Sequence, residues 1–338
     1  MTRTGIPAGS NTALLHRTCV VGGAGFIGGH FVARLLSDPE TEQVTVYDNF
    51  TSGSDWHLER VKDDPRLTVV RADVGVLAKL TETFAGHGAV IHLASNPDIA
   101  AAVANPAIDF DQGTLLTHHV AEAARMAGIG LVLYASGSGV YGDLGELEAA
   151  EDHGPMVPTS TYGASKLAGE AILAAYAAMF DFTARAFRFG NVVGPSQTHG
   201  VGFDFVRRLL DEPTRLRILG DGQQSKSYIF VEDVIEAVLL AGSQAETPFD
   251  AFNVATGDYV TVTEIAEIAL QVLGIEPGAT SFDYTGGARG WKGDVPVVRI
   301  ATGKIRALGW ANERTGPEAL RDSMTLMADE ARAGLLGS

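Results

Sequence analysis

The sequence contains almost no cysteine and no long apolar run. Cys19 is the one cysteine among 338 residues, so no disulfide forms within the chain, and we expect Cys19 to fill the core of a cytoplasmic protein. No run of about 18 apolar residues is present, and we therefore expect no membrane span. The first 17 residues lack the apolar stretch and cleavage site of a signal peptide, and we expect them to be a flexible leader.

Positive charge is also scarce. Lysine and arginine number 25 against 41 aspartates and glutamates, which gives a formal net charge of −16. Nucleic acids and anionic membranes bind to basic surfaces, so we expect neither as a partner. A small anionic ligand is still compatible with this composition if a few cations meet in one cleft.

Two kinds of catalytic site are not expected. The histidines do not cluster as metal ligands, because His118 and His119 are neighbours on one predicted helix and point in different directions, while His92 lies in a predicted buried strand. We therefore expect no metal. The G-x-S-x-G motif of a nucleophile elbow is absent, which disfavours a hydrolase.

The first half of the chain alternates apolar runs with helical periodicity. Helices are predicted over 28–38 and 115–128, and strands are predicted over 18–23, 43–48, 67–73, 89–95 and 131–136. Strands that are apolar almost throughout and are joined by helices indicate a parallel sheet covered on both faces. Right-handed crossovers then give an α/β fold with a doubly wound parallel sheet of the Rossmann type.

The second half begins with a predicted helix over 160–180 and a strand over 183–195. Beyond it, loops rich in glycine and proline alternate with short helices such as 261–274, which indicates a smaller C-terminal α/β domain. The stretch 228–242 is apolar enough to return to the first sheet. The boundaries that follow are 18–194 plus about 228–258 for the first domain, and 195–227 plus 259–338 for the second.

The segment VVGGAGFIGG joins the first predicted strand to the first helix. Gly22 allows a tight turn, and Gly25 allows the backbone to approach a pyrophosphate closely. Gly28 allows the helix to pack on the strand. The helix N-terminus offers free N–H groups and a partial positive charge to the phosphates. This placement between a strand and a helix predicts a dinucleotide site.

Two aspartates end the neighbouring strands. Asp48 lies 20 residues beyond Gly28, where a carboxylate accepts hydrogen bonds from the adenosine ribose hydroxyls. It would repel the 2′-phosphate of NADP, so NAD is the expected cofactor. Asp73 and Val74 end the third strand on the same side. Asp73 there either accepts a hydrogen bond from the adenine amino group or simply caps the strand.

Tyr162 and Lys166, in the segment YGASK, are four residues apart and share one face of a predicted helix. A tyrosine with a pKa of about 10 is a poor base at neutral pH, but a nearby ammonium and a nicotinamide cation favour the phenolate. The phenolate can then take the proton of a substrate hydroxyl while the substrate carbon gives hydride to NAD. The pair follows the glycine motif by about 130 residues, and the two signals support each other.

With these motifs in place, the sequence resembles the extended short-chain dehydrogenases/reductases of the nucleotide-sugar epimerase and dehydratase family. It is most similar there to the UDP-glucose 4-epimerase-like enzymes. The resemblance spans residues 18 to about 310 and rests on GGAGFIGGH, VYDNFTSG, RADV, IHLASNPD, YASGSGVYGD, TYGASK, FRFGNVVGP, ILGDGQQSKSYIFVEDV and RGWKGDVP. It implies that the first domain binds NAD and that the second binds a nucleotide sugar.

The resemblance also implies roles for single residues. Tyr162 is the base, Lys166 holds the nicotinamide ribose and tunes Tyr162, and Phe189 lies beside the nicotinamide. The expected cofactor contacts are Gly22, Gly25, Phe26, Ile27, Gly28, Asp48, Asn49, Ser52, Gly53, Asp73, Val74, Leu93, Ala94, Ser95, Tyr162, Lys166 and Phe189.

Four residues are expected to bind the sugar nucleotide. Asn191 contacts its diphosphate region. Lys226 stands where many family members have an arginine, and it supplies the charge without the bidentate fork. Arg289 is the choice for a second phosphate cation, with Lys292 as its competitor.

The residues before Val140 help to choose the reaction. In the sugar-nucleotide 4,6-dehydratases an Asp and a Glu precede this valine and move protons during the loss of water, and the uronate decarboxylases usually have a Glu next to it. Here Gly137, Ser138 and Gly139 occupy these places. A 4-epimerase needs no such acid, because it oxidises C4, lets the ketosugar rotate and returns the hydride to the other face. The resemblance therefore favours an NAD-dependent NDP-sugar 4-epimerase, with UDP-hexose as the expected substrate.

One position departs from the epimerase pattern. Three residues before the valine, epimerases normally have a Ser or Thr that relays the C4 hydroxyl proton, and here the residue is Gly137. We predict that Ser138 carries the relay. Ser136, which lies nearer the strand, is the other candidate, and loss of the relay is the third.

Two alternatives to the epimerase stay open. One is a related dehydratase or oxidoreductase that uses the 4-keto intermediate differently. The other is a non-catalytic NAD-binding sensor of the same fold, against which the intact Tyr162 and Lys166 argue. The resemblance further implies a homodimer packed through helices near 100–127 and 160–180.

Overall fold

Seven parallel strands form the central sheet of the structure, a computed structural model that describes residues 5–244, 246–291 and 293–334. Their order is β12-β7-β5-β4-β1-β2-β3, and each neighbouring pair is parallel. The strands are β1 (Arg17–Val21), β2 (Gln43–Asp48), β3 (Leu67–Arg71), β4 (Ala89–His92), β5 (Leu131–Gly137), β7 (Thr183–Phe189) and β12 (Phe249–Val254). The doubly wound Rossmann-type fold expected from the sequence is confirmed.

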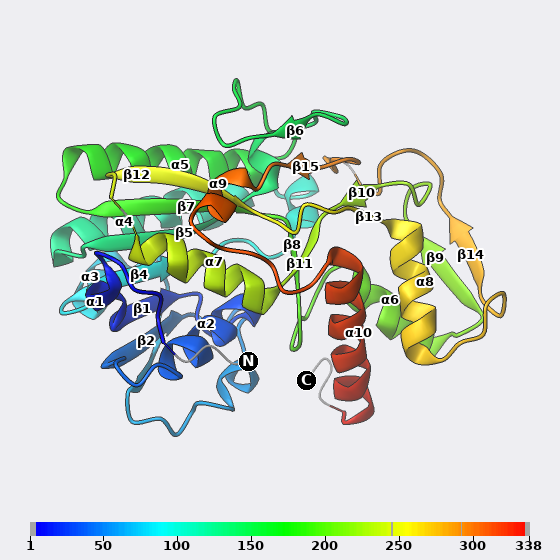
Figure 1. The fold of residues 1–338 in the computed structure, drawn as a ribbon, viewed down its shortest axis with the longest axis horizontal. Helices are drawn as coiled ribbons and strands as arrows, with labels where there is room; N and C mark the ends of the chain where they lie inside the picture. Colours follow the sequence, from blue (N-terminus) through cyan, green and yellow to red (C-terminus); the bar gives the residue numbers. More distant parts are fainter. Residues whose placement is uncertain (1–4, 245, 292, 335–338) are drawn as a thin grey trace.

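Helices cover both faces of this sheet (Figure 1). One face carries α1 (Thr12–Leu15), α2 (Phe26–Leu36) and α7 (Val231–Ser243), and the other carries α3 (Leu77–Phe84), α4 (Leu115–Ala127) and α5 (Thr161–Met179). A π-helical turn, Phe110–Thr114, leads into α4. Short 3-10 helices occupy Asp55–Leu58, Ile99–Val103 and Ser138–Val140.

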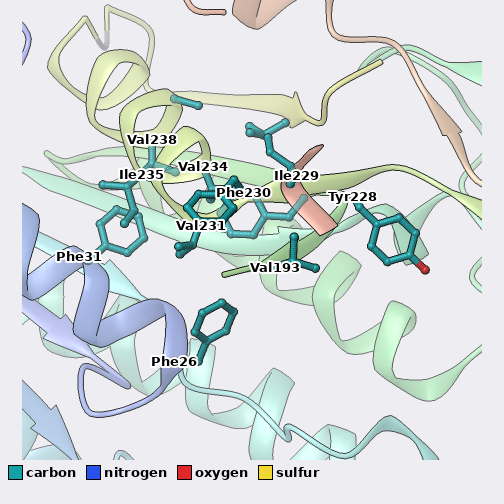
Figure 2. Packing of buried hydrophobic residues seen from close by; sticks show 14 of the residues in the cluster. Phe26, Phe31, Val193, Tyr228, Ile229, Phe230, Val231, Val234, Ile235 and Val238 are labelled. Atoms are coloured by element: carbon teal, nitrogen blue, oxygen red, sulfur yellow. The ribbon is translucent and has the colours of Figure 1, made fainter. Parts of the chain in front are cut away.

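The core is formed where α2 and α7 meet beneath the sheet. Phe31 and Leu35 lie four residues apart on α2 and therefore share one face, and both are completely buried. Figure 2 shows Phe31 beside Ile235 of α7, with Val231 and Val234 of the same helix close by. Full burial of an aromatic or aliphatic side chain of this size contributes about 1.5–3 kcal/mol. This packing fixes the direction of α2, the helix whose N-terminus faces the predicted cofactor.

A second lobe follows the central sheet in the chain and lies to the right in Figure 1. Its helices α6 (Val201–Asp211), α8 (Val262–Leu273) and α10 (Gly316–Arg332) pack on one another. Its strands form pairs, β9 (Arg215–Ile218) with β14 (Ser281–Tyr284), and β10 (Ser225–Lys226) with β13 (Val260–Thr261). The pair of β8 (Asn191–Val193) and β11 (Tyr228–Phe230) connects the two parts.

One part of the predicted second domain lies against the first. The strand β15 (Arg299–Ile300) pairs with β6 (Glu148–Ala149), and α9 (Gly303–Ala307) packs on β12 at the edge of the central sheet. The domain boundaries given above stay a prediction.

Several expected elements are corrected. The predicted strand over 183–195 is divided at Gly190 into β7 and β8. The apolar stretch 228–242 adds no strand to the central sheet, because most of it forms α7, and β12 is the edge strand instead.

The expected leader is not flexible throughout. Its described part contains α1, in which Leu15 is fully buried. The Ile6 N–H donates to Asp38 Oδ2 at 2.5 Å, and the Asn11 N–H donates to the Ser243 carbonyl at 2.9 Å. Cys19 fills the core, as expected, since its side chain is fully buried in β1.

A buried ion pair ties α5 to the sheet. Arg188 on β7 and Glu170 on α5 are almost completely buried, and their nearest charged atoms lie 2.7 Å apart. Glu170 also accepts a hydrogen bond from the Ser136 hydroxyl at 2.6 Å, and Arg188 donates to the Tyr141 hydroxyl at 2.8 Å. Because burial strips both charges of water, loss of one partner leaves the other uncompensated.

We expect Glu170→Ala to lower the free energy of unfolding by about 3–5 kcal/mol, because it leaves the Arg188 guanidinium buried without its counter-charge. The matched control is Glu122→Ala, which removes a helical glutamate paired with Arg125 near the surface and should cost about 1 kcal/mol or less. Urea denaturation measures both, and equal losses would contradict the assignment.

Candidate active site

The C-terminal edge of the central sheet collects the predicted cofactor residues. The chain runs from β1 outward to β2 and β3 on one side, and β4 and β5 lie on the other, so the strand order reverses between β1 and β4. Ligands of open parallel sheets bind in the crevice at such a switch point. Gly22 follows β1 and Asp48 ends β2, as predicted. The strands predicted over 67–73 and 89–95 are shorter, since β3 ends at Arg71 and β4 at His92, so Asp73 and Leu93 lie just beyond them.

The glycine loop brings backbone segments closer than side chains would allow. Gly22 has a φ of +83°, and a Cβ there would lie 2.8 Å from the Ala94 backbone nitrogen. A Cβ at Gly28 would lie 2.2 Å from the Gly22 carbonyl oxygen. Helix α2 begins at Phe26, followed by Ile27, and its N-cap, Gly25, provides no side-chain cap. The first N–H groups of α2 are therefore directed toward the crevice.

Asp48 orders the loop that faces the cofactor. Its Oδ2 accepts the Ala24 N–H at 3.0 Å, and its Oδ1 accepts the Phe50 N–H at 2.7 Å. Asn49, Ser52 and Gly53 follow in this loop, where a Cβ at Gly53 would lie 3.0 Å from Asp48 Oδ1. Each carboxylate oxygen retains a second lone pair, so the predicted ribose contact is compatible with these bonds.

Asp73 has local partners. Its Oδ2 accepts a hydrogen bond from the Asn49 amide at 2.8 Å, and its Oδ1 accepts the Gly75 N–H at 2.7 Å. The neighbouring Val74 is buried. The structure thus brings Asn49 and Asp73 together at one end of the crevice, while the contact of Asp73 with adenine stays a prediction.

Tyr162 and Lys166 lie in the first turns of α5. The Ser160 hydroxyl caps this helix by accepting the Gly163 N–H at 3.1 Å, and the apolar face of the helix packs on β5 and β7. The Lys166 nitrogen donates to the Ala135 carbonyl at 2.8 Å and lies 5.5 Å from the centre of the Tyr162 ring. The two residues therefore lie close together on one helix, as the sequence predicts, and Lys166 also reaches the end of β5.

The electrostatics of this pair oppose its charged forms. Burial raises the pKa of Tyr162 to about 12, an effect that a hydrogen bond with the Ser95 side chain opposes and the charge of Asp109 reinforces. Burial lowers the pKa of Lys166 to about 8, and the charge of Asp109 opposes that shift. An added positive charge near the phenol would lower the pKa of Tyr162, which is what a cationic nicotinamide provides.

Asp109 is a site residue that sequence reasoning missed. Its carboxylate is buried, its Oδ1 accepts the Asn96 amide at 2.9 Å, and its Oδ2 accepts the Thr161 hydroxyl at 2.6 Å. Asp109 therefore links Asn96, which follows Ser95, to Thr161, which precedes Tyr162. No motif distinguishes Asp109 from the nearby Asp111, so the sequence offers no signal for this role.

The segment after β5 contains the two serines considered for the relay. The Ser136 hydroxyl donates to Glu170 inside the protein, which gives Ser136 a structural partner. Gly137 is extended and lies opposite Phe189 of β7, and Ser138 begins a 3-10 helix. The relay role of Ser138 stays a prediction.

The predicted phosphate cations Lys226 and Arg289 both contact Asp294 in the second lobe, Lys226 at its carboxylate and Arg289 at its backbone carbonyl. The Lys226 nitrogen lies 2.7 Å from Asp294 Oδ1, and Arg289 donates to the Asp294 carbonyl at 2.7 Å. Arg289 also pairs with Asp143 at 2.8 Å. Lys226 and Arg289 are thus brought together. The competitor Lys292 lies outside the described residues.

The remaining predicted residues occupy different places. The exposed Asn191 is the first residue of β8, where its amide donates to the Ser227 carbonyl at 3.2 Å.

His92 is fully buried, and burial together with Lys166 lowers its pKa to about 3. Within the described ranges, no three His, Cys, Asp or Glu side chains form a group that could hold a metal ion.

A glycine loop at the switch point, an aspartate ending β2 and a half-buried tyrosine beside a buried lysine define a class, the NAD-binding proteins of the short-chain dehydrogenase/reductase type. The chain belongs to the NAD dependent epimerase/dehydratase family, whose model matches residues 18–255.

Individual relatives agree with this placement. A UDP-glucose 4-epimerase from Mycolicibacterium smegmatis is 36% identical over 256 residues, which cover 74% of this chain and 80% of the relative. A crystal structure of a UDP-galactose 4-epimerase has a TM-score of 0.81 at 35% identity and covers 93% of this chain and 99% of its own. A dTDP-glucose 4,6-dehydratase from Streptomyces venezuelae, solved with NAD bound, has a TM-score of 0.85 at 27% identity, with coverages of 94% and 98%.

NAD is the cofactor of this family, and the residues present fit it. A Cβ at Gly25 would meet the Gly22 carbonyl oxygen at 3.4 Å, an ordinary contact, so the protein leaves the space before α2 open. The uncapped N–H groups there suit a pyrophosphate, and Asp48 suits a ribose without a 2′-phosphate.

We expect Gly28→Ala and Gly25→Ala to differ in their effects. The first places a Cβ 2.2 Å from backbone and should lower both the melting temperature without cofactor and the affinity for NAD. The second is tolerated by the protein, so the melting temperature without cofactor should stay near wild-type while NAD binding weakens. Thermal denaturation and calorimetric titration with NAD measure these effects. Wild-type NAD affinity in Gly25→Ala would contradict the placement of the pyrophosphate.

Proposed function

We propose that the protein is an NAD-dependent NDP-sugar 4-epimerase that acts on a UDP-hexose. Tyr162 takes the proton of the C4 hydroxyl, and Lys166 keeps the phenol in position at the end of β5. NAD, when bound, accepts the C4 hydride and returns it. Rotation of the ketosugar between the two transfers changes the face on which the hydride arrives.

The composition of the β5 loop is the observation that carries this proposal. Gly137, Ser138 and Gly139 supply no carboxylate where the related dehydratases and decarboxylases have their acids. Asp109 is a buried acid that contacts Thr161, the residue before Tyr162. One of its carboxylate oxygens accepts a hydrogen bond from Asn96 and the other accepts one from Thr161. Both of its oxygens are therefore engaged by protein groups, and the composition of the loop favours epimerisation over the loss of water.

A dehydratase is the second candidate, because the fold similarity to the dTDP-glucose 4,6-dehydratase is as high as that to the UDP-galactose 4-epimerase. Both reactions begin with oxidation at C4, so they differ only in the fate of the ketosugar. A sensor of the same fold would need neither Tyr162 nor Lys166.

The nucleotide end of the substrate is proposed to lie against the second lobe. Lys226 and Arg289 together provide two positive charges, and Asp294 keeps them close to each other. A diphosphate carries the complementary negative charge. The Lys226 ammonium offers it a point charge, whereas an arginine would offer two parallel hydrogen bonds.

A second copy of the chain is proposed to pack on α4 and α5. Both helices leave large apolar side chains exposed, Leu115 and Met126 on α4 and Met179 on α5. The cytoplasm is the proposed location, because it keeps Cys19 reduced. No helix in the described part of the chain is long and apolar enough to span a membrane.

We expect the wild-type protein to interconvert a UDP-hexose and its C4 epimer, and Tyr162→Phe to lower this turnover by about 10²–10⁴ while retaining NAD. Incubation with a panel of nucleotide sugars, followed by NMR, identifies the product. A product that has lost water would assign the dehydratase reaction, and no product from any member of the panel would support the sensor.

We expect Lys226→Met to weaken the binding of UDP about tenfold, the equivalent of about 1.4 kcal/mol, because it removes one of the two cations. Lys226→Arg is the matched control and should bind UDP at least as tightly as the wild type, since the guanidinium restores the charge and adds a fork. Isothermal titration with UDP measures both, and unchanged affinity in Lys226→Met would place the diphosphate elsewhere.

A further inference from the structure

The imidazole of His57 lies between two backbone carbonyl groups. Its Nδ1 is 2.7 Å from the Ala24 carbonyl oxygen, and its Nε2 is 3.0 Å from the Ser196 carbonyl oxygen. A carbonyl oxygen only accepts hydrogen bonds, and a neutral histidine has one N–H and one unprotonated nitrogen. Both carbonyls therefore receive a hydrogen bond only when both nitrogens donate, which is the case in the positively charged imidazolium.

The packing of the backbone sets the position of this ring. His57 belongs to the 3-10 helix Asp55–Leu58, which packs on α2. A Cβ at Gly29 of α2 would lie 2.7 Å from the His57 carbonyl oxygen, so the two backbones are in direct contact. The ring of Trp56 lies beside the imidazole, with 5.1 Å between the ring centres.

The first of the two carbonyls belongs to the glycine loop that faces the cofactor. Ala24 is completely buried, and its carbonyl also accepts the Ser54 N–H at 2.9 Å. It precedes Gly25, the N-cap of α2, where the pyrophosphate of NAD is expected. A charged donor makes a hydrogen bond about twice as strong as a neutral one, so the imidazolium holds this turn most firmly. Its positive charge also favours an anion at the adjacent helix N-terminus.

The second carbonyl lies where the chain leaves β8 for the second lobe. Ser196 has a φ of +65°, a left-handed conformation that is uncommon for residues other than glycine. Its N–H lies 3.1 and 3.2 Å from the two carboxylate oxygens of Glu330 on α10. Ser196 is thus held at its carbonyl by His57 and at its N–H by a carboxylate. The imidazolium therefore links the cofactor loop with the second lobe.

Titratable groups on the neighbouring elements also act on His57. His30 on α2 lies 3.0 Å from the Pro195 carbonyl, and burial lowers its pKa, so its neutral form satisfies the single carbonyl that it faces. Arg60, which follows the 3-10 helix, acts on His30 and Glu330 together with His57. Burial raises the pKa of Glu330, and its hydrogen bonds and the two nearby cations oppose that rise. Of the two histidines, His57 is the one whose hydrogen bonds require the second proton.

We propose that His57 is a positioning residue for NAD and that its imidazolium holds Ala24 and the turn before α2 in the conformation that binds the cofactor. NAD and the proton on His57 then bind cooperatively, and each raises the affinity for the other by the same factor. Histidine changes its charge between about pH 5 and 8, so the affinity for NAD is highest below this range and falls as the pH rises through it. The proposal concerns the cofactor and holds for an epimerase and a dehydratase alike.

Calorimetric titration of the full-length protein, freed of NAD, tests this coupling. The wild-type affinity for NAD should fall about tenfold between about pH 6 and 8, a coupling of ordinary size. Near neutral pH the binding should take up protons, which are measured as the difference between the heats recorded in PIPES and in Tris. His57→Gln has no charge to lose, so it should bind NAD about tenfold more weakly than the wild type at the acidic end and lose most of both effects.

His30→Gln is the matched control, because it replaces a histidine that contacts the same turn through one carbonyl. It should keep the pH dependence and the proton uptake of the wild type. Lys166, whose pKa burial lowers to about 8, is present in all three proteins and does not affect their comparison. The melting temperature without NAD shows whether each variant is folded.

A wild-type affinity that stays constant over this pH range would overturn the proposal, and this measurement needs no variant. Proton uptake that persists undiminished in His57→Gln would overturn it as well. Loss of the uptake in His30→Gln, with retention in His57→Gln, would assign the coupling to His30. The product formed from a nucleotide sugar has no bearing on these results, so failure of the proposed epimerase activity and failure of this proposal are distinguishable.

Discussion

The close approach of three backbone segments at Gly22 is the constraint on which the site depends. The turn after β1, the first turn of α2 and the chain after β4 meet there with no room for a Cβ at Gly22 or Gly28. This contact begins α2 at the edge of the sheet, where its N–H groups face the crevice, and it also holds Leu93 and Ala94 beside the glycine loop. The predicted cofactor contacts on the glycine loop and after β4 therefore share one cause.

The buried charges near Tyr162 make the base depend on the cofactor. Burial raises the pKa of Tyr162 to about 12, and Asp109 adds to the shift, so the phenol keeps its proton at neutral pH in the protein alone. Asp109 also supports the protonated form of Lys166 against burial. A cationic nicotinamide acts on the phenol in the opposite direction to Asp109. In the proposed mechanism, deprotonation of the substrate by Tyr162 would thereby be coupled to the presence of the oxidised cofactor.

The sequence predicts the elements of the site whose spacing has a local physical meaning. The glycine loop can be predicted because Gly22, Gly25 and Gly28 lie together at one strand-to-helix turn. The catalytic pair can be predicted because Tyr162 and Lys166 are one helical turn apart on the same helix. The role of Asp109 does not follow, since it depends on which distant segments become neighbours. The same reason explains the error at 228–242, where an apolar stretch suits a buried helix as well as a strand.

The proposed diphosphate ligand would require this acidic protein to bring cations together. The chain carries a formal charge of −16, yet Lys226 and Arg289 meet at Asp294 in the second lobe. Asp294 is nearly buried, with one carboxylate oxygen on Lys226 and the other on the Gly290 N–H, so it orders the cations without itself facing solvent. The outer surface of each cation remains available to phosphate oxygens. Each of the two cations is paired with a carboxylate, Lys226 with Asp294 and Arg289 with Asp143, so the proposed diphosphate would compete with these aspartates for them.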